Sequence, residues 1–346
     1  MTDLITHLSN ITDPRSALGK RHKLEEIIII AICGIICGAD DWVMIEYFGK
    51  AKKEWFESFL SLPHGIPSHD TFGQVFSLIN PQEFEKCFMD WVQEIAIMTK
   101  GQLIALDGKT VRRSHDRTNG KAAIHLVSAW ATHNGVVMGQ VKVDDKSNEI
   151  TAIPELLKML EIEGCIISID AMGTQKEIVS TILEQKGDYL LAVKQNQGQL
   201  FQQIDCAYSL DRKNDFKDAP YDYAKTVEKN HGRIETRQCW VTSDPEYIRY
   251  VDPEGSWESL KSIVIIDATR KERDKTTSQS RYFISSLHVG AAQMMKFIRQ
   301  HWEIENKLHW SLDVTFREDQ SRVRVGHAPE KDRKSTRLNS SHRIRY

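Results

Sequence analysis

Two aspartates follow short apolar runs that are bounded by small residues. Asp107 comes directly after the run 103–106, and Asp170 comes directly after the run 166–169. Apolar runs this short, flanked by glycine or alanine, indicate buried strands rather than helices. Ligands of open α/β sheets bind at the carboxyl ends of the strands. The two aspartates could therefore meet at one sheet edge, where hard oxygen ligands favour Mg²⁺ or Mn²⁺ over zinc.

Each aspartate also has an ordinary structural interpretation. Asp107-Gly108 is a common turn signal, and an aspartate that precedes a helix, as Asp170 does, often only caps it. A third carboxylate could come from the acidic stretch near residue 303. Glu303 and Glu305 point about 200° apart on a helix of about 3.6 residues per turn, so geometry alone does not choose between them.

The elements that would position these residues alternate between strand and helix. Strands are predicted at 102–107, 122–131, 135–143, 165–170 and 188–194, with helices at 151–162 and from Thr174, where Thr174–Glu177 has the form of a capping box. A β-rich segment at about 207–288 follows, with strand candidates at 233–241, 259–267 and 281–287, and then a helix at about 291–310. This order predicts an α/β protein with an RNase H-like catalytic core, a mixed sheet flanked by helices, and a β-rich insertion.

Residues 1–98 are predicted to form a separate helical domain. The apolar segment 24–38 is predicted to be a core helix, although its four consecutive isoleucines also fit a strand. One amphipathic helix is expected at 41–60, and two short helices begin after Ser68 and at Pro81. The short pair fits either a DNA-binding helix-turn-helix or a helical domain that packs on the rest of the chain.

Composition sets limits on partners and compartment. The 346 residues carry a formal net charge of -2, so any nucleic-acid surface must come from local clusters of Lys and Arg. Six cysteines without zinc-site spacing indicate a reducing compartment. The start of the chain does not have the pattern of a signal peptide, and the apolar run 27–37 is too short for a bilayer that needs about 20 residues. We therefore expect a cytoplasmic protein without a membrane segment.

Several short motifs together resemble one family. They are Asp107-Gly108-Lys109, Ile169–Gly173, Lys194–Gln197, His231–Glu235 and His301–Asn306. Over about residues 10–329 the chain resembles bacterial insertion-sequence transposases of the DDE type, in particular the H-repeat-associated proteins. The resemblance implies Mg²⁺-dependent hydrolysis of phosphodiester bonds at the ends of a DNA element, followed by strand transfer into target DNA. It also implies that Asp107, Asp170 and Glu305 are the catalytic, metal-binding triad.

The resemblance further implies that double-stranded DNA is the partner and that the active form is a homo-oligomer. Candidate DNA contacts are Lys109, Arg112, Arg113, Lys146, Asn148, Lys194, Asn196, Arg233, His301 and His309. A solvated loop or a structural role is an equal alternative for most of them. His301, Glu305 and His309 are spaced four apart, but no HExxH motif is present, so the histidines are expected to contact phosphate or to pack near the site.

The expected domains are 1–98 (helical, DNA-binding), 99–330 (catalytic, with the insertion) and 331–346, a basic, Ser-rich tail. This tail looks like a translated cloning adaptor and is expected to be disordered. It stands where the family continues into an apolar helix, so the product could be inactive. Two alternatives remain open, namely an RNase H-like nuclease without strand transfer and a DNA-binding transposase relic without catalysis.

Overall fold

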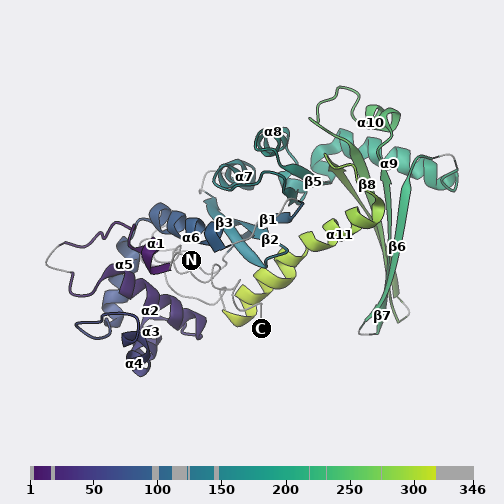
Figure 1. Cartoon of the computed structure of the whole chain (residues 1–346). Helices are drawn as coiled ribbons and strands as arrows, with labels where there is room; N and C mark the ends of the chain where they lie inside the picture. Colours follow the sequence, from purple (N-terminus) through teal and green to yellow (C-terminus); the bar gives the residue numbers. More distant parts are fainter. Residues whose placement is uncertain are drawn as a thin grey trace. The chain divides into compact units, whose positions relative to one another are not determined.

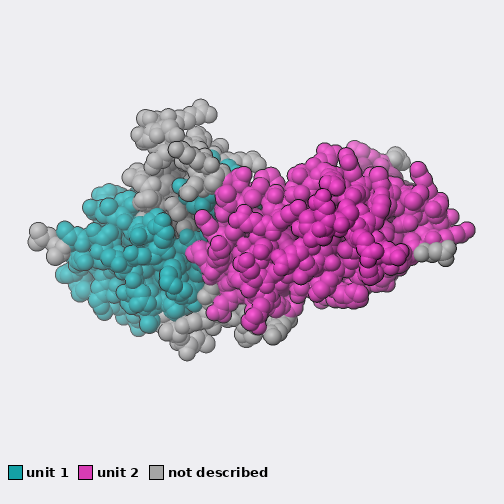
Figure 2. All heavy atoms as spheres, turned by 90° about the horizontal axis from the view of Figure 1, so that it is seen from above, with its two compact units in different colours: residues 1–98, 108–146, 304–346 teal, residues 99–107, 147–303 magenta. Residues whose placement is uncertain are grey.

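The computed structural model describes residues 4–16, 20–95, 101–110, 123, 125–143, 148–217, 219–230, 232–273 and 275–316. The chain divides into two compact units (Figure 2). Unit 1 comprises residues 1–98, 108–146 and 304–346, and unit 2 comprises residues 99–107 and 147–303. The candidate DNA contacts Arg112, Arg113 and Lys146 lie outside the described residues, as does the tail 331–346.

Six helices open unit 1 (Figure 1): α1 (Leu4–Leu8), α2 (Leu24–Ile36), α3 (Trp42–Ala51), α4 (Lys53–Glu57), α5 (His69–Leu78) and α6 (Pro81–Ile95). The isoleucine-rich segment is helical, as predicted, and Ile27, Ile28 and Ile30 have no exposed surface. Ser68 caps α5, because its hydroxyl accepts a hydrogen bond from the Thr71 amide at 3.4 Å.

The prediction of a single helix at 41–60 is wrong. It is broken at Lys52, whose dihedrals (φ -113°, ψ 20°) leave the helical region between α3 and α4. After the break Phe56 is completely buried and its ring lies 6.0 Å from that of Phe48. Aromatic packing across the break therefore replaces the continuous helix that amphipathic periodicity favoured.

Unit 1 also contains an antiparallel hairpin of β2 (His125–Ala131) and β3 (Val136–Val143). Gly135 has a positive φ of 64° in its turn, so the turn predicted at residues 133–135 is confirmed. The last residues of β1 (Leu103–Thr110) lie beside β2, and the Thr110 hydroxyl is 2.8 Å from His125 Nδ1. Helix α6 contacts β3.

Unit 2 is built on a mixed sheet in the order β1-β4-β5-β9-β8-β7-β6. Strands β4 (Ile166–Ile169) and β5 (Asp188–Val193) run parallel to β1. The other four strands are antiparallel, namely β6 (Asp222–Asn230), β7 (Arg233–Thr242), β8 (Ser262–Glu272) and β9 (Lys275–Ser285). The meander β1-β2-β3 followed by parallel β4 and β5, with helices flanking the sheet, is the RNase H-like core that was predicted.

Five helices accompany this sheet: α7 (Glu149–Lys158), α8 (Lys176–Glu184), α9 (Gly198–Lys213), α10 (Pro245–Val251) and α11 (Ala291–His301). Helix α11 lies against the sheet (Figure 1) and buries Met294, Phe297 and Ile298 in one cluster with Val264 and Phe283. This contact forms the core beneath the insertion strands.

Some boundaries differ from those expected. The prediction of a capping box at Thr174 is wrong. Gln175 is the N-cap of α8 and makes no side-chain capping bond, and the Thr174 hydroxyl donates to the Ala192 carbonyl instead. Strand β6 and helix α9 were not predicted. The helix expected at 291–310 ends at His301, and residues 304–309 form a π-helix. Because a π turn takes up an extra residue, the spacing of four does not place Glu305 and His309 on one α-helical face.

We expect Met294→Ala to lower the free energy of unfolding by about 2–5 kcal/mol, the usual range for truncating a buried methionine. Met294 has no exposed surface and lies in the cluster that joins α11 to the sheet. Urea unfolding followed by circular dichroism measures the change. Lys296→Ala, on the exposed side of the same helix, is the control and should change stability little. Equal effects of the two substitutions would contradict this packing.

A second expectation concerns the acid stability of unit 1. Hydrogen bonds from Lys50 and from the backbone and ring of His69 lower the pKa of Glu46 from 4.5 to about 2. Stability from a lowered carboxyl pKa is present above the unfolded value and is lost as the pH falls through the folded value. Glu46→Gln should therefore lower the melting temperature at neutral pH, and the deficit should shrink as the pH falls from 4.5 toward about 2.

Thermal unfolding across this pH range tests the expectation. Glu54→Gln, at an exposed acid of α4, is the matched control and should show no pH-dependent deficit. A Glu46→Gln deficit that stays constant with pH would mean that the carboxylate charge is not what links α3 to α5.

Candidate active site

Asp107 and Asp170 occupy matching positions on neighbouring parallel strands of unit 2. The register pairs Leu106 of β1 with Ile169 of β4, and each of these residues is followed directly by an aspartate. The strands do not end alike, because β1 continues to Thr110 whereas β4 stops at Ile169. Both aspartates are half-buried, at the end of a buried layer that is apolar except for Ser168. The pairing therefore brings two carboxylates to one sheet edge.

Local hydrogen bonds hold the backbone around Asp170. Its Oδ1 accepts from the Met172 amide at 3.0 Å and so caps the short 3-10 turn Ala171–Gly173. The segment after β5 braces this turn, because Asn196 Nδ2 donates to the Ala171 carbonyl at 2.6 Å and Gln197 Nε2 donates to the Thr174 carbonyl at 2.7 Å. Asn196, a candidate DNA contact, thus has a structural bond as well.

His301 lies close to the same edge at the end of α11. Its Nδ1 is 3.0 Å from the hydroxyl of Ser168, which stands on β4 two residues before Asp170. Burial lowers the pKa of His301 from 6.5 to about 4, and the charge of Asp170 and the bond to Ser168 oppose this shift only in part. The imidazole is therefore neutral at neutral pH. It neither repels a cation nor offers a positive charge to phosphate, which favours the prediction that it packs near the site.

Glu305 belongs to unit 1. It is exposed on the π-helical segment Ile304–His309, whose residues Ile304 and Leu308 are completely buried and hold the segment in place. His309 is half-buried on the same segment, while Glu303 is half-buried in unit 2. Within the described part of unit 2, no group of three or more His, Cys, Asp or Glu side chains forms a metal site.

The other candidate DNA contacts fall in different settings. Lys109 forms an ion pair with Asp313 in unit 1 and is largely buried. Asn148 caps α7 by accepting from the Ile150 amide at 3.0 Å, and Arg233 pairs with Glu235 on β7. Lys194 is exposed just before the segment that braces Asp170. Lys194 thus combines an exposed cation with a place beside the aspartate pair.

Sequence reasoning missed Ser168 and Gly173. Ser168 is the one polar residue in the apolar run 166–169, and that interruption was the available signal. A Cβ on Gly173 would lie 2.3 Å from Cγ2 of Ile169 and 3.1 Å from Cδ1 of Ile153. Only glycine fits there without displacing the strand end that carries Asp170.

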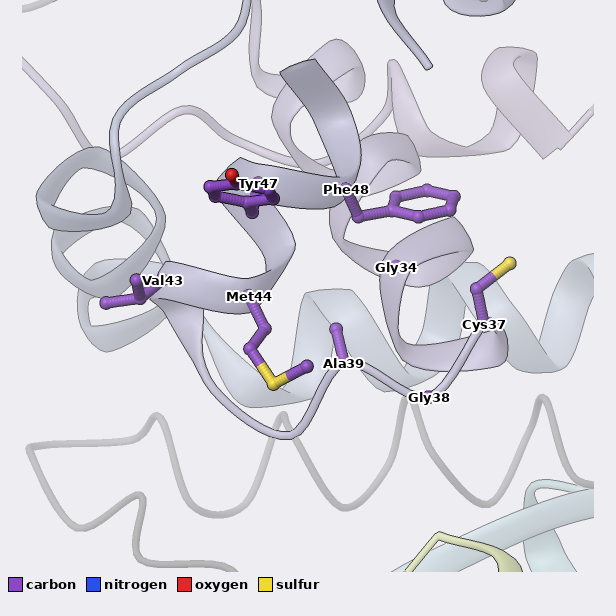
Figure 3. Close-up of a pocket in the computed structure, with 8 residues that line it drawn as sticks. All are labelled: Gly34, Cys37, Gly38, Ala39, Val43, Met44, Tyr47 and Phe48. Atoms are coloured by element: carbon purple, nitrogen blue, oxygen red, sulfur yellow. The ribbon is translucent and has the colours of Figure 1, made fainter. Parts of the chain in front are cut away.

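A pocket of about 330 Å³ opens between α2 and α3 of unit 1 (Figure 3). It is lined by Gly34, Cys37, Gly38, Ala39, Val43, Met44, Tyr47 and Phe48. Because this lining holds no carboxylate and no histidine, the pocket has no groups for metal-dependent hydrolysis. Among the described helices, none has an apolar stretch long enough to span a membrane.

Comparisons with known proteins identify the family. Residues 98–329 match the model of the transposase DDE domain, and residues 5–92 match the model of the DDE_Tnp_1-associated region. The chain belongs to the bacterial DDE transposases. "Putative transposase YncI" of Escherichia coli O157:H7 is 44% identical over 94% of this chain and 83% of its own length. "H repeat-associated putative transposase YhhI" of Escherichia coli strain K12 is 41% identical over 94% of this chain and 86% of its own.

The DDE transposase family comprises nucleases and polynucleotidyl transferases, and the predicted resemblance to H-repeat-associated proteins is confirmed. Among solved structures, a chain of the piggyBac transposase synaptic complex with hairpin DNA covers 100% of this chain and 80% of its own, with 10% identity and a TM-score of 0.38. The roles of Asp107, Asp170 and Glu305 within this DDE transposase remain predictions from the motifs.

We expect Gly173→Ala to lower the free energy of unfolding by about 1–3 kcal/mol, as overpacking a tight site usually does. The same substitution should reduce activity, because the displaced Ile169 directly precedes Asp170. Gly198→Ala is the matched control, since a Cβ there meets nothing within 4 Å. Urea unfolding and a DNA-nicking assay measure both effects. Equal stability of the two variants would show that the space at Gly173 is not limiting.

Proposed function

We propose that this chain is a DNA transposase that hydrolyses phosphodiester bonds at the ends of its element and transfers the freed 3′ ends into target DNA. The observation that supports the proposal is the register of β1 with β4, in which the residues directly before Asp107 and Asp170 are paired. Membership of the DDE transposase family supports the same reaction class.

Mg²⁺, or Mn²⁺ in its place, would be held by Asp107, Asp170 and Glu305. The donors fit a hard divalent cation, since all are carboxylate oxygens. In unit 2 one oxygen of Asp170 is engaged with the Met172 amide, while the nearby His301 carries no positive charge that would compete with a cation. When bound, a pair of such ions supplies activation of the attacking oxygen and stabilisation of the leaving oxygen.

The protein's own contribution is orientation. The β1–β4 hydrogen bonds set the spacing of the two aspartates, and the turn capped by Asp170 holds the backbone beside its carboxylate. Positioning of this kind lowers a barrier without covalent chemistry on the enzyme, because the charges are already arranged before the reaction. Lys194, exposed just before the bracing segment, would contact the phosphate backbone near the cut.

We assign DNA recognition to residues 1–98 and catalysis to residues 99–330. Helices α5 and α6 are separated by only Ile79 and Asn80, a connection as tight as that of a helix-turn-helix. Since two element ends must be cut, the active form would contain at least two copies of the chain.

The test replaces each proposed metal ligand by its neutral isostere, as Asp107→Asn, Asp170→Asn and Glu305→Gln. Each should lower Mg²⁺-dependent cleavage of DNA that carries candidate terminal repeats by more than about 100-fold. Substituting a residue that only hydrogen-bonds to a metal ligand already costs up to about 100-fold, and loss of the ligand itself should cost more. Glu303→Gln is the matched control from the same stretch and should keep its activity. Unchanged cleavage by Asp107→Asn or Asp170→Asn would refute the assignment.

Two further measurements separate the alternatives. Cleavage without joined product in a strand-transfer assay would indicate a nuclease. Salt-dependent DNA binding without any Mg²⁺-dependent product would indicate a relic that only binds DNA.

A further inference from the structure

The four antiparallel strands β6, β7, β8 and β9 of unit 2 present two chemically different faces. In an antiparallel sheet, directly opposed residues point to the same side and successive residues alternate. The register aligns Lys229, Ile234, Lys271 and Thr276 in one row across the four strands. It aligns Glu228, Glu235, Arg270 and Thr277 in the next row, on the opposite face. The face of each residue therefore follows from pairing alone.

The face that carries Glu228 and Glu235 is covered by α11. Near the core, Cys239, Val241 and Ile266 pack against α11 in the hydrophobic cluster. Farther out, this face carries carboxylates that already have partners. Arg237 pairs with both Glu228 and Glu235, and Arg299 of α11 also binds Glu228. The pairing Arg270–Glu272 at 2.9 Å continues the pattern toward the tip. The carboxylates of this face are therefore engaged, although its cations, which also include Arg233, Lys275 and Arg281, outnumber them.

The opposite face, which carries Lys229 and which we name the open face, is covered at its base by the described residues of unit 2. There α9 packs on it through Tyr208, whose ring lies 5.5 Å from that of Trp240 and 6.3 Å from that of Tyr282. Beyond α9 the strands continue as long arms (Figure 1). Along β6 the side chains alternate, with Lys225, Val227 and Lys229 exposed and the residues between them half-buried.

The outer part of the open face consists of three rows that each cross β6, β7, β8 and β9 in that order. The rows are Lys225, Gln238, Asp267 and Ser280; Val227, Thr236, Thr269 and Ser278; and Lys229, Ile234, Lys271 and Thr276. Its single carboxylate is already engaged, because Asp267 accepts from Tyr208 at 2.8 Å and from Ser280 at 2.6 Å and lies 3.3 Å from Arg212. Among the described residues, Lys225, Lys229 and Lys271 have no carboxylate partner. The open face thus gathers unbalanced cations and hydroxyl groups.

We propose that the open face binds the phosphate backbone of duplex DNA. The proposal rests on the DNA substrate of the proposed function and adds a second contact surface outside the aspartate pair. Lysine ammonium groups and Ser or Thr hydroxyls are standard ligands of DNA phosphates. A protein partner is disfavoured by the chemistry, since protein interfaces are poor in lysine and gather several aromatic residues at their centre. The outer part of this face offers Val227 and Ile234, with Tyr223 as the one exposed aromatic residue beside them among the described residues.

The spacing of the cations also suits a duplex. Lys225 and Lys229 are four residues apart on one strand, which is about 13 Å, and Lys229 and Lys271 lie in one row two strands apart, which is about 10 Å. These separations are of the order of the major-groove width of about 12 Å. The three ammonium groups can therefore contact several phosphates of one duplex, and a net charge of -2 on the whole chain does not oppose such a local site.

The test compares two triple variants with the same change in net charge. Lys225→Gln/Lys229→Gln/Lys271→Gln removes the cations of the open face. Lys158→Gln/Lys176→Gln/Lys261→Gln removes exposed lysines elsewhere in unit 2. Binding to a labelled duplex of mixed sequence is measured by fluorescence anisotropy over a range of salt. The open-face variant should bind about tenfold or more weakly, with a slope of log K against log salt shallower by about 2–3, since each lost phosphate contact removes about 0.9.

A gain-of-function variant keeps the test informative if the triple variant is unstable. Val227→Lys adds a cation to an exposed position on the open face and should tighten binding and steepen the salt slope by about one. Leu210→Lys, at an exposed position of α9, is its control.

The outcomes separate this proposal from the function itself. Equal salt slopes for both triple variants, or no tightening by Val227→Lys beyond its control, would overturn the open face even if Mg²⁺-dependent cleavage by the parent chain stands. A selective loss of binding in the open-face variant would support the face even if the parent chain cuts no DNA. A parent chain without salt-dependent duplex binding would overturn both.

Discussion

The parallel pairing of β1 with β4 is the constraint on which the candidate site depends. Their hydrogen bonds oppose Leu106 to Ile169, so the following residues, both aspartates, come to one sheet edge. Two carboxylates at the ends of neighbouring strands repel each other when both are ionised. The buried isoleucines and leucines of the two strands offset this repulsion, because their removal from water favours the folded sheet. The apolar layer thus maintains a charge arrangement that would be unfavourable by itself.

Charge is managed differently in different parts of unit 2. Beside the aspartates, burial lowers the pKa of His301 to about 4, so this histidine adds no positive charge there at neutral pH. On the covered face of the insertion, arginines pair with Glu228, Glu235 and Glu272. On the open face, the acid Asp267 pairs with Arg212 and accepts from tyrosine and serine hydroxyls, so it does not pair with the lysines. With the function and the open face proposed above, one unit would combine a negative site for cations with a positive surface for phosphates, the division that a metal-dependent DNA enzyme requires.

The parts of the fold that were predictable are those in which local pattern and burial agree. The strands β1, β4 and β5 are short apolar runs between glycines or polar residues, and they were placed within a few residues. Strand β6 was missed because Asp222–Asn230 is charged and exposed on one side, so its strand conformation comes from pairing with β7 rather than from its own apolar content. The π-helical turn at 304–309 has no signal of its own, since Ile304 and Leu308 also fit an ordinary helix.

The candidate site shows the same division between local and long-range information. The two aspartates could be predicted because each directly follows a short apolar run in the sequence. The fold class then predicts that the two runs are neighbouring parallel strands, which brings their ends together. The contact of Ser168 with His301 spans 133 residues and depends on where α11 lies on the sheet, so no local pattern contains it. The open face is still less visible in the sequence, because four strands with mixed charges yield a carboxylate-poor surface only in one register. A shift of one residue in β7 against β8 would move the acids onto the lysine side and remove the face.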